Sequence, residues 1–208
     1  MRPIGFLAYE GVEELDLVGP WEMATMWRDY AGGPECVAVA AQAGPVPCAK
    51  GLSLLAHHGF DDAPGLSVLL VPGGFAAFDV MKDSATIDYV RNAAAQADHV
   101  MSVCSGAFIL QAAGLLDGKR ATTHWKAIPR LRETGVDVVE ERFVRDGSVW
   151  TSAGVSAGID LFLHFVAETQ GAEVADIVQH NAEYYPDGVR YGDLHKADDM
   201  PDYMRRLD

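Results

Sequence analysis

The chain has 208 residues, of which 49% are hydrophobic and 22% are charged, as is ordinary for one compact globular domain with a substantial core. Its formal net charge is −14, and the sequence has no cluster of Lys and Arg that would neutralise phosphates. Both features argue against nucleic acids and anionic membrane surfaces as partners. No apolar run approaches the ~20 residues that span a bilayer, and the first residues lack the pattern of a signal peptide.

The cysteines indicate the compartment. Cys36, Cys48 and Cys104 are an odd number without the spacing of a disulfide framework, which favours a reduced, cytoplasmic protein. The cysteines and the seven histidines form no CxxC or HxxxH pair, so we expect no structural zinc site.

Short apolar runs alternate with longer segments that carry apolar residues at helical spacing. The run at 66–71 is almost continuously apolar, as in parallel strands covered on both faces, and Asp146-Gly147 is typical of a type I′ turn in a hairpin. In chain order the pattern predicts strand 3–9, helix 15–30, strand 36–41, a small hairpin with its return strand at 52–56, strand 66–71, helix 85–97, strand 99–103, helices 105–116 and 122–133, strands 138–144 and 148–151, and helices 156–168 and 172–183. This alternation predicts an α/β fold with a doubly wound, mostly parallel sheet between helices.

The chain changes character near its end. From residue 185 onward it is polar, with many Asp and Arg residues. We therefore expect one domain over 1–184 and a polar tail over 185–208 that either wraps over a partner subunit or stays loosely ordered.

In doubly wound sheets, ligands bind at the carboxyl ends of the strands, near the point where the strand order reverses. Three loops end strands at that edge, namely the loop after Tyr9, the loop 72–74 and the loop 103–105. Cys104 lies in the third loop, between a strand and a helix. A free cysteine is most often a small buried hydrophobe, and Cys36 and Cys48 have no setting that argues otherwise.

Its position favours a chemical role for Cys104. A residue that ends a strand and opens a helix lies against the helix N–H groups and the positive end of the helix dipole, which stabilises a thiolate and lowers the thiol pKa. A similar strand–turn–helix geometry aims the nucleophile out of the sheet in hydrolases, and Gly106 leaves room for the turn. We predict that Cys104 is a reactive nucleophile.

Two further segments carry candidate site residues. Pro72-Gly73-Gly74 is either an ordinary strand-ending turn or a source of bare N–H groups that stabilise developing negative charge. Asp16 is either a helix cap or, because Leu15 and Leu17 flank it, a carboxyl group whose pKa is raised and which moves a proton; Glu13 and Glu14 are expected to be solvated.

His124 gives a third possibility. After Thr122-Thr123, His124-Trp125 is either a capped helix start with Trp125 in the core or the source of a catalytic Cys–His pair. The sequence leaves both alternatives open.

Four segments together resemble the ThiJ/PfpI superfamily. They are LDLVGP at 15–20, VPGG at 71–74, SVCSGAFILQAAGLLDGKRATTHW at 102–125 and TSAGVSAGID at 151–160. The segment 102–125 is the most specific, and it is most similar to the isonitrile hydratases and next to the ligand-sensing domains of AraC-type regulators. The resemblance implies a flavodoxin-like, glutamine-amidotransferase-like sandwich that forms a homodimer.

The resemblance also implies roles for particular residues. The nucleophilic cysteine of the family corresponds to Cys104, the acidic residue that hydrogen-bonds it corresponds to Asp16, and the oxyanion contacts of the glycine turn correspond to Gly73 and Gly74. His124 is included among the substrate-binding candidates.

Two pocket positions depart from the hydratases. Ser105 stands where threonine is common, which keeps the hydroxyl and loses a methyl group, and Val155 stands where isoleucine is common. We count both as substrate-binding residues. The peptidases of the superfamily have histidine directly after the cysteine, so Ser105 argues against peptidase activity.

The implied activity is that of a hydro-lyase, a carbon–oxygen lyase that hydrates a small isonitrile, R–N≡C, to an N-substituted formamide through a cysteine thioimidate, without metal or organic cofactor. The alternatives are a ligand-sensing domain without turnover and a cysteine redox or stress protein. AraC-type regulators carry a helix-turn-helix domain after the sensing domain, and we see no basic region of that kind before residue 208, which favours the enzyme.

Overall fold

In a computed structural model that describes residues 1–189 and 191–205, six strands form the central sheet in the order β2-β1-β5-β6-β10-β9. All neighbouring strands are parallel except β9, which pairs antiparallel with β10 at one edge. The strands span Ile4–Leu7 (β1), Cys36–Val39 (β2), Val68–Val71 (β5), His99–Val103 (β6), Phe143–Asp146 (β9) and Val149–Ser152 (β10). The predicted doubly wound, mostly parallel sheet is confirmed.

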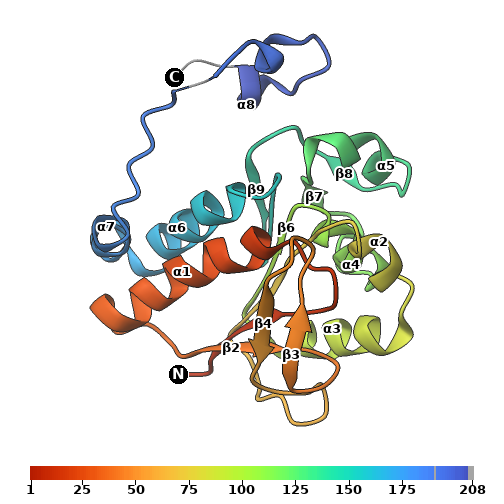
Figure 1. The fold of residues 1–208 in the computed structure, drawn as a ribbon, viewed down its shortest axis with the longest axis vertical. Coiled ribbons are helices and arrows are strands. Elements are labelled where there is room, and N and C mark those ends of the chain that lie inside the picture. Colours follow the sequence, from red (N-terminus) through yellow and green to blue (C-terminus); the bar gives the residue numbers. More distant parts are fainter. Residues whose placement is uncertain (190, 206–208) are drawn as a thin grey trace.

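Helices cover both faces of this sheet (Figure 1). One layer consists of α1 (Glu14–Ala31), α6 (Ala157–Gln170) and α7 (Ala172–Asn181), which pack against one another, and the other of α2 (Ala77–Val80), α3 (Ser84–Gln96) and α4 (Gly106–Ala112). Each layer encloses its own apolar cluster, with Phe162 on the first face and Phe108 on the second. The sheet is thus buried on both sides, as the apolar strands require.

Local sequence signals set several helix ends. The Asp83 side chain accepts a hydrogen bond from the Thr86 N–H and caps the start of α3. Gly32 ends α1 in the left-handed conformation at φ 70°. Gly147 has φ 64°, which fits the predicted tight turn between β9 and β10.

Three predicted elements differ from those in the structure. The helix predicted at 105–116 ends at Ala112, and the strand predicted at 138–144 is divided between β8 (Asp137–Val138), which pairs with β7 (Arg120–Ala121), and β9. The segment 122–133 forms a 3₁₀ turn, η1 (Trp125–Ala127), and a short α5 (Ile128–Arg132). Pro129 explains the division, because it cannot donate to a preceding turn and starts a new helix.

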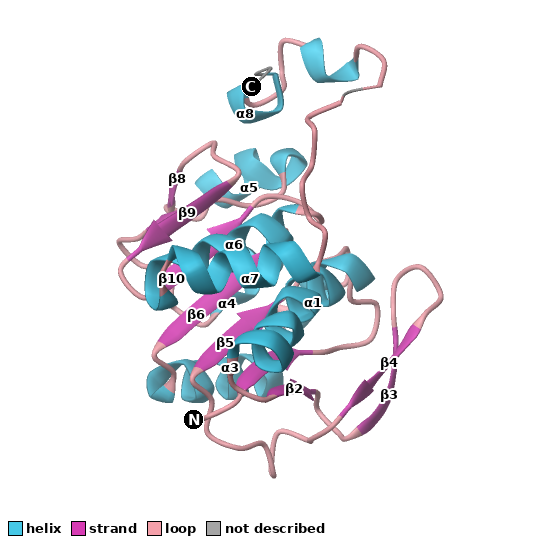
Figure 2. Ribbon diagram, turned by 90° about the vertical axis from the view of Figure 1, so that its left-hand side faces the viewer, coloured by secondary structure: helices cyan, strands magenta, loops and turns pink. Residues whose placement is uncertain are grey.

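A separate hairpin and the tail lie outside the sandwich. The predicted hairpin consists of β3 (Gly44–Pro47) and β4 (Ser53–Ala56). The tail carries η2 (Leu194–Lys196) and α8 (Asp202–Arg205), and Figure 2 shows it beyond the end of the molecule that holds α5. Arg142 lines a cavity together with the tail residues Tyr191, Leu194, His195, Tyr203 and Met204. Its Nε donates to Asp160 Oδ2 at 2.7 Å.

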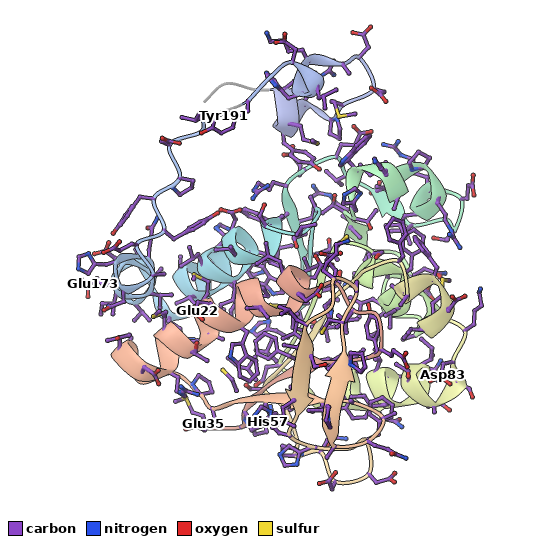
Figure 3. All side chains as sticks on the ribbon, viewed as in Figure 1. Glu22, Glu35, His57, Asp83, Glu173 and Tyr191 are labelled. Carbon is purple, nitrogen blue, oxygen red and sulfur yellow. The ribbon has the colours of Figure 1, made fainter. Side chains whose placement is uncertain are left out.

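The excess of acidic residues is on the outside of the molecule. Figure 3 shows the exposed side chains of Glu22 on α1 and Glu173 on α7 at the outer surface of the helical layer. Among the described residues, no helix has both the length and the apolar character needed to cross a membrane.

Candidate active site

The sheet register brings three loops together at the carboxyl ends of the strands. Val71 of β5 pairs with Ser102 of β6, and Val103 pairs with Ser152 of β10, so the loops that follow these strands lie side by side. The strand order reverses between β1 and β5, and α1 enters the same edge after β1. This is the position at which doubly wound sheets bind ligands.

Cys104 occupies a strained turn at this edge. Its φ of 59° lies in the left-handed region, which costs a non-glycine residue roughly 1–2 kcal/mol. Neighbouring loops hold it there, because its N–H donates to the carbonyl of Ser152 at 3.1 Å and of Ala153 at 3.0 Å, and its own carbonyl accepts from Thr123 Oγ1 at 2.8 Å. The chain thus fixes the direction of the thiol.

The turn depends on a glycine directly after it. A Cβ at Gly106 would collide with the backbone carbonyl oxygen of Val71 and lie 2.8 Å from that of Pro72. We expect Gly106→Ala to lower the free energy of unfolding by about 3 kcal/mol, since backbone cannot yield as a flexible side chain does. Denaturant unfolding measures this loss. Gly65→Ala is the matched control, because a Cβ there meets open space and should leave stability nearly unchanged; equal stability of the two variants would contradict the close approach.

Asp16 lies beside Cys104 and is completely buried. Its Oδ2 accepts a hydrogen bond from the Gly73 N–H at 2.9 Å, whereas its Oδ1 is buried without a hydrogen-bond partner among the described residues. Burial raises the pKa of Asp16 to about 7, although the Gly73 N–H and the Cys104 thiol act in the opposite direction. A carboxyl group of this kind exchanges protons near neutral pH.

The thiol has an unexpected pKa. Burial, and then the negative charge of Asp16, raise the pKa of Cys104 to about 12, while the N–H groups of Ser105 and Val155 lower it in part. The predicted lowering of this pKa by the helix N-terminus is therefore wrong, because desolvation and the neighbouring carboxylate outweigh the helix. The thiol needs a base to remove its proton.

The glycine turn acts differently from the prediction. The Gly73 N–H donates to Asp16, and the Gly74 N–H donates to Ser105 Oγ at 2.9 Å, while that hydroxyl donates to the Gly74 carbonyl at 2.7 Å. We predicted that the N–H groups of Gly73 and Gly74 are free to donate to a bound atom. This prediction is wrong, because both N–H groups already donate hydrogen bonds within the protein. Gly73 orients the carboxyl group, and Ser105 holds the turn.

A cavity of about 320 Å³ opens at Cys104. Of the predicted site residues, Gly74, Ser105, Val155 and His124 also line it, and Asp16 and Gly73 lie behind the thiol. The structure therefore brings all seven predicted site residues to one place. Val155 has φ 49°, a second left-handed residue at this edge.

His124 faces the cavity without forming a Cys–His pair. Its Nδ1 accepts from the Lys126 N–H at 3.2 Å, and no hydrogen bond joins it to Cys104 in the part of the chain that the structure describes. Burial, and then the charge of Lys126, lower the pKa of His124, which keeps the imidazole neutral. Gly154 gives the ring its space, since a Cβ there would collide with it.

Sequence reasoning missed several residues of this site. Glu14 was expected to be solvated, but it is buried and accepts from the Lys50 N–H at 2.7 Å. Tyr9 donates to the carbonyl oxygens of Pro72 and Gly73 at 2.9 and 2.8 Å and so supports the glycine turn. The other missed residues line the cavity: Glu13, Phe75, Phe78, Lys126, Ala127 and Arg130.

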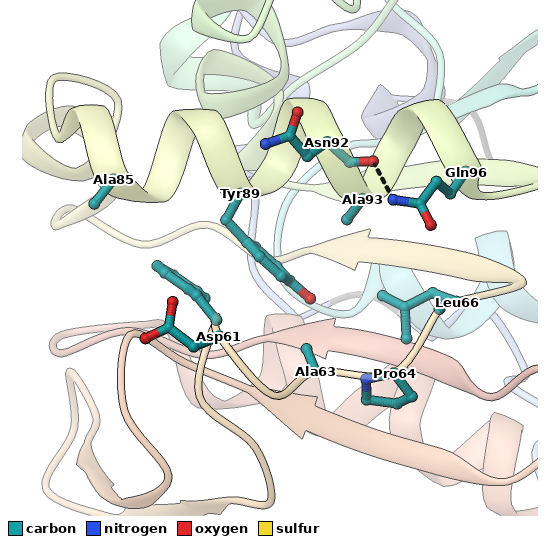
Figure 4. Close-up of a pocket in the computed structure, with 11 residues that line it drawn as sticks. Asp61, Ala63, Pro64, Leu66, Ala85, Tyr89, Asn92, Ala93 and Gln96 are labelled. Atoms are coloured by element: carbon teal, nitrogen blue, oxygen red, sulfur yellow. Dashed lines mark hydrogen bonds between the residues drawn. The ribbon is translucent and has the colours of Figure 1, made fainter.

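Other parts of the described chain lack this combination. Figure 4 shows a second cavity, of about 370 Å³, between α3 and the loop before β5, in which the Tyr89 ring stacks on Phe60 and no thiol is present. Burial raises the pKa of Cys36 to about 12, and the carboxylates that act on it, Glu35 and Asp29, are exposed, unlike Asp16. Within residues 1–189 and 191–205, no group of three or more His, Cys, Asp or Glu side chains could hold a metal ion.

Fold and site together define a doubly wound α/β protein with a buried cysteine–carboxyl pair at its strand ends. The DJ-1/PfpI family model matches residues 2–168, and the chain belongs to this family. It is 42% identical over 192 residues to the isonitrile hydratase of Pseudomonas putida, covering 88% of this chain and 78% of that one. It is 32% identical over 139 residues to the HTH-type transcriptional regulator CdhR of Pseudomonas aeruginosa, covering 66% of this chain and 41% of the regulator.

Solved structures agree with this assignment. A ThiJ/PfpI family protein from Pseudomonas syringae has a TM-score of 0.86 at 36% sequence identity, covering 94% of this chain and 80% of that one. The resemblance inferred from the four sequence segments is confirmed.

Proposed function

We propose that the protein is a hydro-lyase that hydrates isonitriles to N-substituted formamides, with Cys104 as the nucleophile and Asp16 as the group that moves protons. The observation that carries the proposal is the unpartnered, buried Oδ1 of Asp16 beside a thiol whose pKa is raised to about 12. A carboxyl group with a pKa of about 7 supplies the base that this thiol needs. The similarity to the P. putida isonitrile hydratase supports the choice of substrate class.

In the first step, the Asp16 carboxylate takes the proton of the Cys104 thiol as sulfur attacks the terminal carbon of R–N≡C. The same proton then passes from Asp16 to that carbon, which gives the thioimidate R–N=CH–S–Cys104. One S–C bond and one C–H bond form, and the S–H bond breaks. The N–H groups of Ser105 and Val155, which face the thiol, stabilise the negative charge that sulfur carries in passing.

In the second step, Asp16 removes a proton from water as the water oxygen attacks the thioimidate carbon, and the nitrogen is protonated. The tetrahedral adduct then expels the Cys104 sulfur, which regains its proton. The product is R–NH–CHO, so the overall reaction adds one water to the isonitrile. Every proton transfer takes place at Asp16, and none requires His124.

The reaction is tested by offering a panel of small isonitriles and measuring formamide by chromatography. We expect turnover whose kcat/KM falls as the pH drops below about 7, because Asp16 must be ionised to accept the thiol proton and burial raises its pKa to about 7. A panel without turnover would overturn the proposal, and so would a rate that rises below pH 7.

We extend the proposal to the assembly. One domain over 1–184 with the tail 185–208 would act as a cytoplasmic homodimer on a small-molecule substrate. Three exposed apolar side chains support a contact between copies near the site: Leu52 just before β4, Leu55 on β4 and Leu15 beside Asp16. Light scattering should give twice the monomer mass; a monomer at ~10 μM would contradict the dimer.

A further inference from the structure

Two cations in the cavity have no ion-pair partner among residues 1–189 and 191–205. Most Lys and Arg side chains in the described part of the chain lie within 4.0 Å of a carboxylate. Arg120, Lys126 and Arg130 are those without such a contact among the described residues, and two of these three line the cavity of Cys104. The chain has 30 Asp and Glu residues and a net charge of −14, so most of its cations find a carboxylate partner. Two unpaired cations in one cavity therefore indicate a binding site for an anionic ligand.

Aromatic rings hold both cations in place. Arg130 lies with its guanidinium 4.0 Å from the ring centroid of Phe78, which packs edge-on against the buried Phe108. Lys126 has its ammonium 5.1 Å from the ring centroid of Trp125. These cation–π contacts favour the observed side-chain positions without neutralising the charges. The cations therefore remain available to an anion.

The charges of the cavity lie on different elements. Lys126 comes from η1 and Arg130 from the α5 helix that follows it, and both line the cavity. Glu13, the acidic residue among the lining side chains, comes from the start of α1 beside Asp16 and forms an ion pair with Lys50 at 3.2 Å. Phe75, Phe78 and Ala127 provide apolar surface in the same cavity. A ligand thus meets a thiol, an apolar wall and a cationic pair.

We propose that the substrate is an isonitrile that bears an anionic group, such as a carboxylate, on an apolar linker, with Lys126 and Arg130 binding the anion while Cys104 attacks the isonitrile carbon. This inference rests on the proposed function for its reacting group and on the cationic pair for its anionic one. The pair also favours an anionic isonitrile over a neutral one of similar size, because only the anion is attracted by the two positive charges.

The experiment compares para-isocyanobenzoate with its methyl ester, which has the same ring and reacting group but no charge. We expect a kcat/KM about fivefold or more higher for the acid at low salt, and a smaller ratio in about 0.5 M NaCl, where surface charges are screened. In the double variant Lys126→Gln/Arg130→Gln the ratio of acid to ester should fall to about one or below. Arg120→Gln is the matched control: this exposed cation also lacks an ion pair but does not line the cavity, so the ratio should persist.

A binding measurement separates failure of this inference from failure of the proposed function. Calorimetry with para-formamidobenzoate and its methyl ester requires no turnover, and we expect the acid to bind about fivefold more tightly to the wild type but not to the double variant. If both isonitriles react at equal rates and both formamides bind equally, the anionic substrate is wrong and the hydratase stands. If neither isonitrile reacts but the acid binds selectively, the cationic site stands and the hydratase is wrong. An equal ratio in wild type and double variant overturns the role of the two cations.

Discussion

Replacing Cys104 by Ala is expected to abolish isonitrile hydration, with a loss of at least about 10⁴-fold in kcat, because Cys104 supplies the one thiol among the described residues that line the cavity, and the thioimidate requires a thiol. The variant should fold, since Ala removes only the buried sulfur and keeps the backbone contacts that hold the turn at φ 59°. Formamide production and thermal unfolding measure the two properties separately.

A cysteine outside the cavity provides the control. Cys48 is half-buried in the loop after β3, and Cys48→Ala should retain nearly full turnover. Substantial formamide production by Cys104→Ala, or an equal loss in Cys48→Ala, would show that the thiol of Cys104 does not carry the reaction.

Replacing Asp16 by Asn is expected to lower kcat/KM by about 100-fold or more while leaving the fold intact, because Asn cannot accept the thiol proton. Asn keeps an oxygen to accept the hydrogen bond that the Gly73 N–H gives to Oδ2, so the glycine turn should hold its position. Turnover close to that of the wild type would reduce Asp16 to a structural role.

Asp16→Asn should also change how the free energy of unfolding depends on pH. The folded-state pKa of Asp16 is raised from 3.8 to about 7, so the folded protein holds this proton more tightly than the unfolded chain does. Stability therefore falls as the pH rises from about 4 to about 7, and the full cost of the buried charge, on the order of 4 kcal/mol, is present above pH 7. Asn does not ionise and escapes this loss.

We therefore expect the free energy of unfolding of Asp16→Asn, relative to wild type, to increase between pH 5 and pH 8. Comparing the two pH values cancels any pH-independent cost of the buried amide. Denaturant unfolding at both values measures the difference. A gap that does not change with pH would contradict a buried carboxyl group with a raised pKa, whatever the activity shows.

The sequence allowed the sheet and the main site residues to be predicted for physical reasons. Continuous apolar runs such as 66–71 can be satisfied only between two helical layers, and carboxyl ends of parallel strands meet at one edge. These arguments placed Cys104 at that edge, whereas the pairing of Asp16 with Cys104, which the structure shows, came from the family resemblance. The family resemblance added Ser105 and Val155, whose positions carry no distinctive pattern of their own.

The remaining features depend on tertiary contacts that the sequence does not encode locally. The pKa of Cys104 depends on how completely the loops bury it and on the charge of Asp16, and helix position alone predicted the wrong direction. The N–H groups of Gly73 and Gly74 could be assigned only after their partners, Asp16 and Ser105, were placed. Lys126 and Arg130 are ordinary surface residues until the structure shows that they line the cavity of Cys104.

The central claim is that Cys104 forms a covalent bond to the isonitrile carbon, and the intact mass of the protein during turnover tests it most directly. Reactions stopped at early times should contain protein that is heavier by the mass of one substrate, since the sulfur and its proton both add to the isonitrile carbon and no group leaves. The adduct should map to the peptide that contains Cys104 and be absent from Cys104→Ala. A ligand sensor would bind reversibly without an adduct, and a redox protein would gain only oxygen. Protein of unchanged mass under turnover, together with formamide production by Cys104→Ala, would contradict the account.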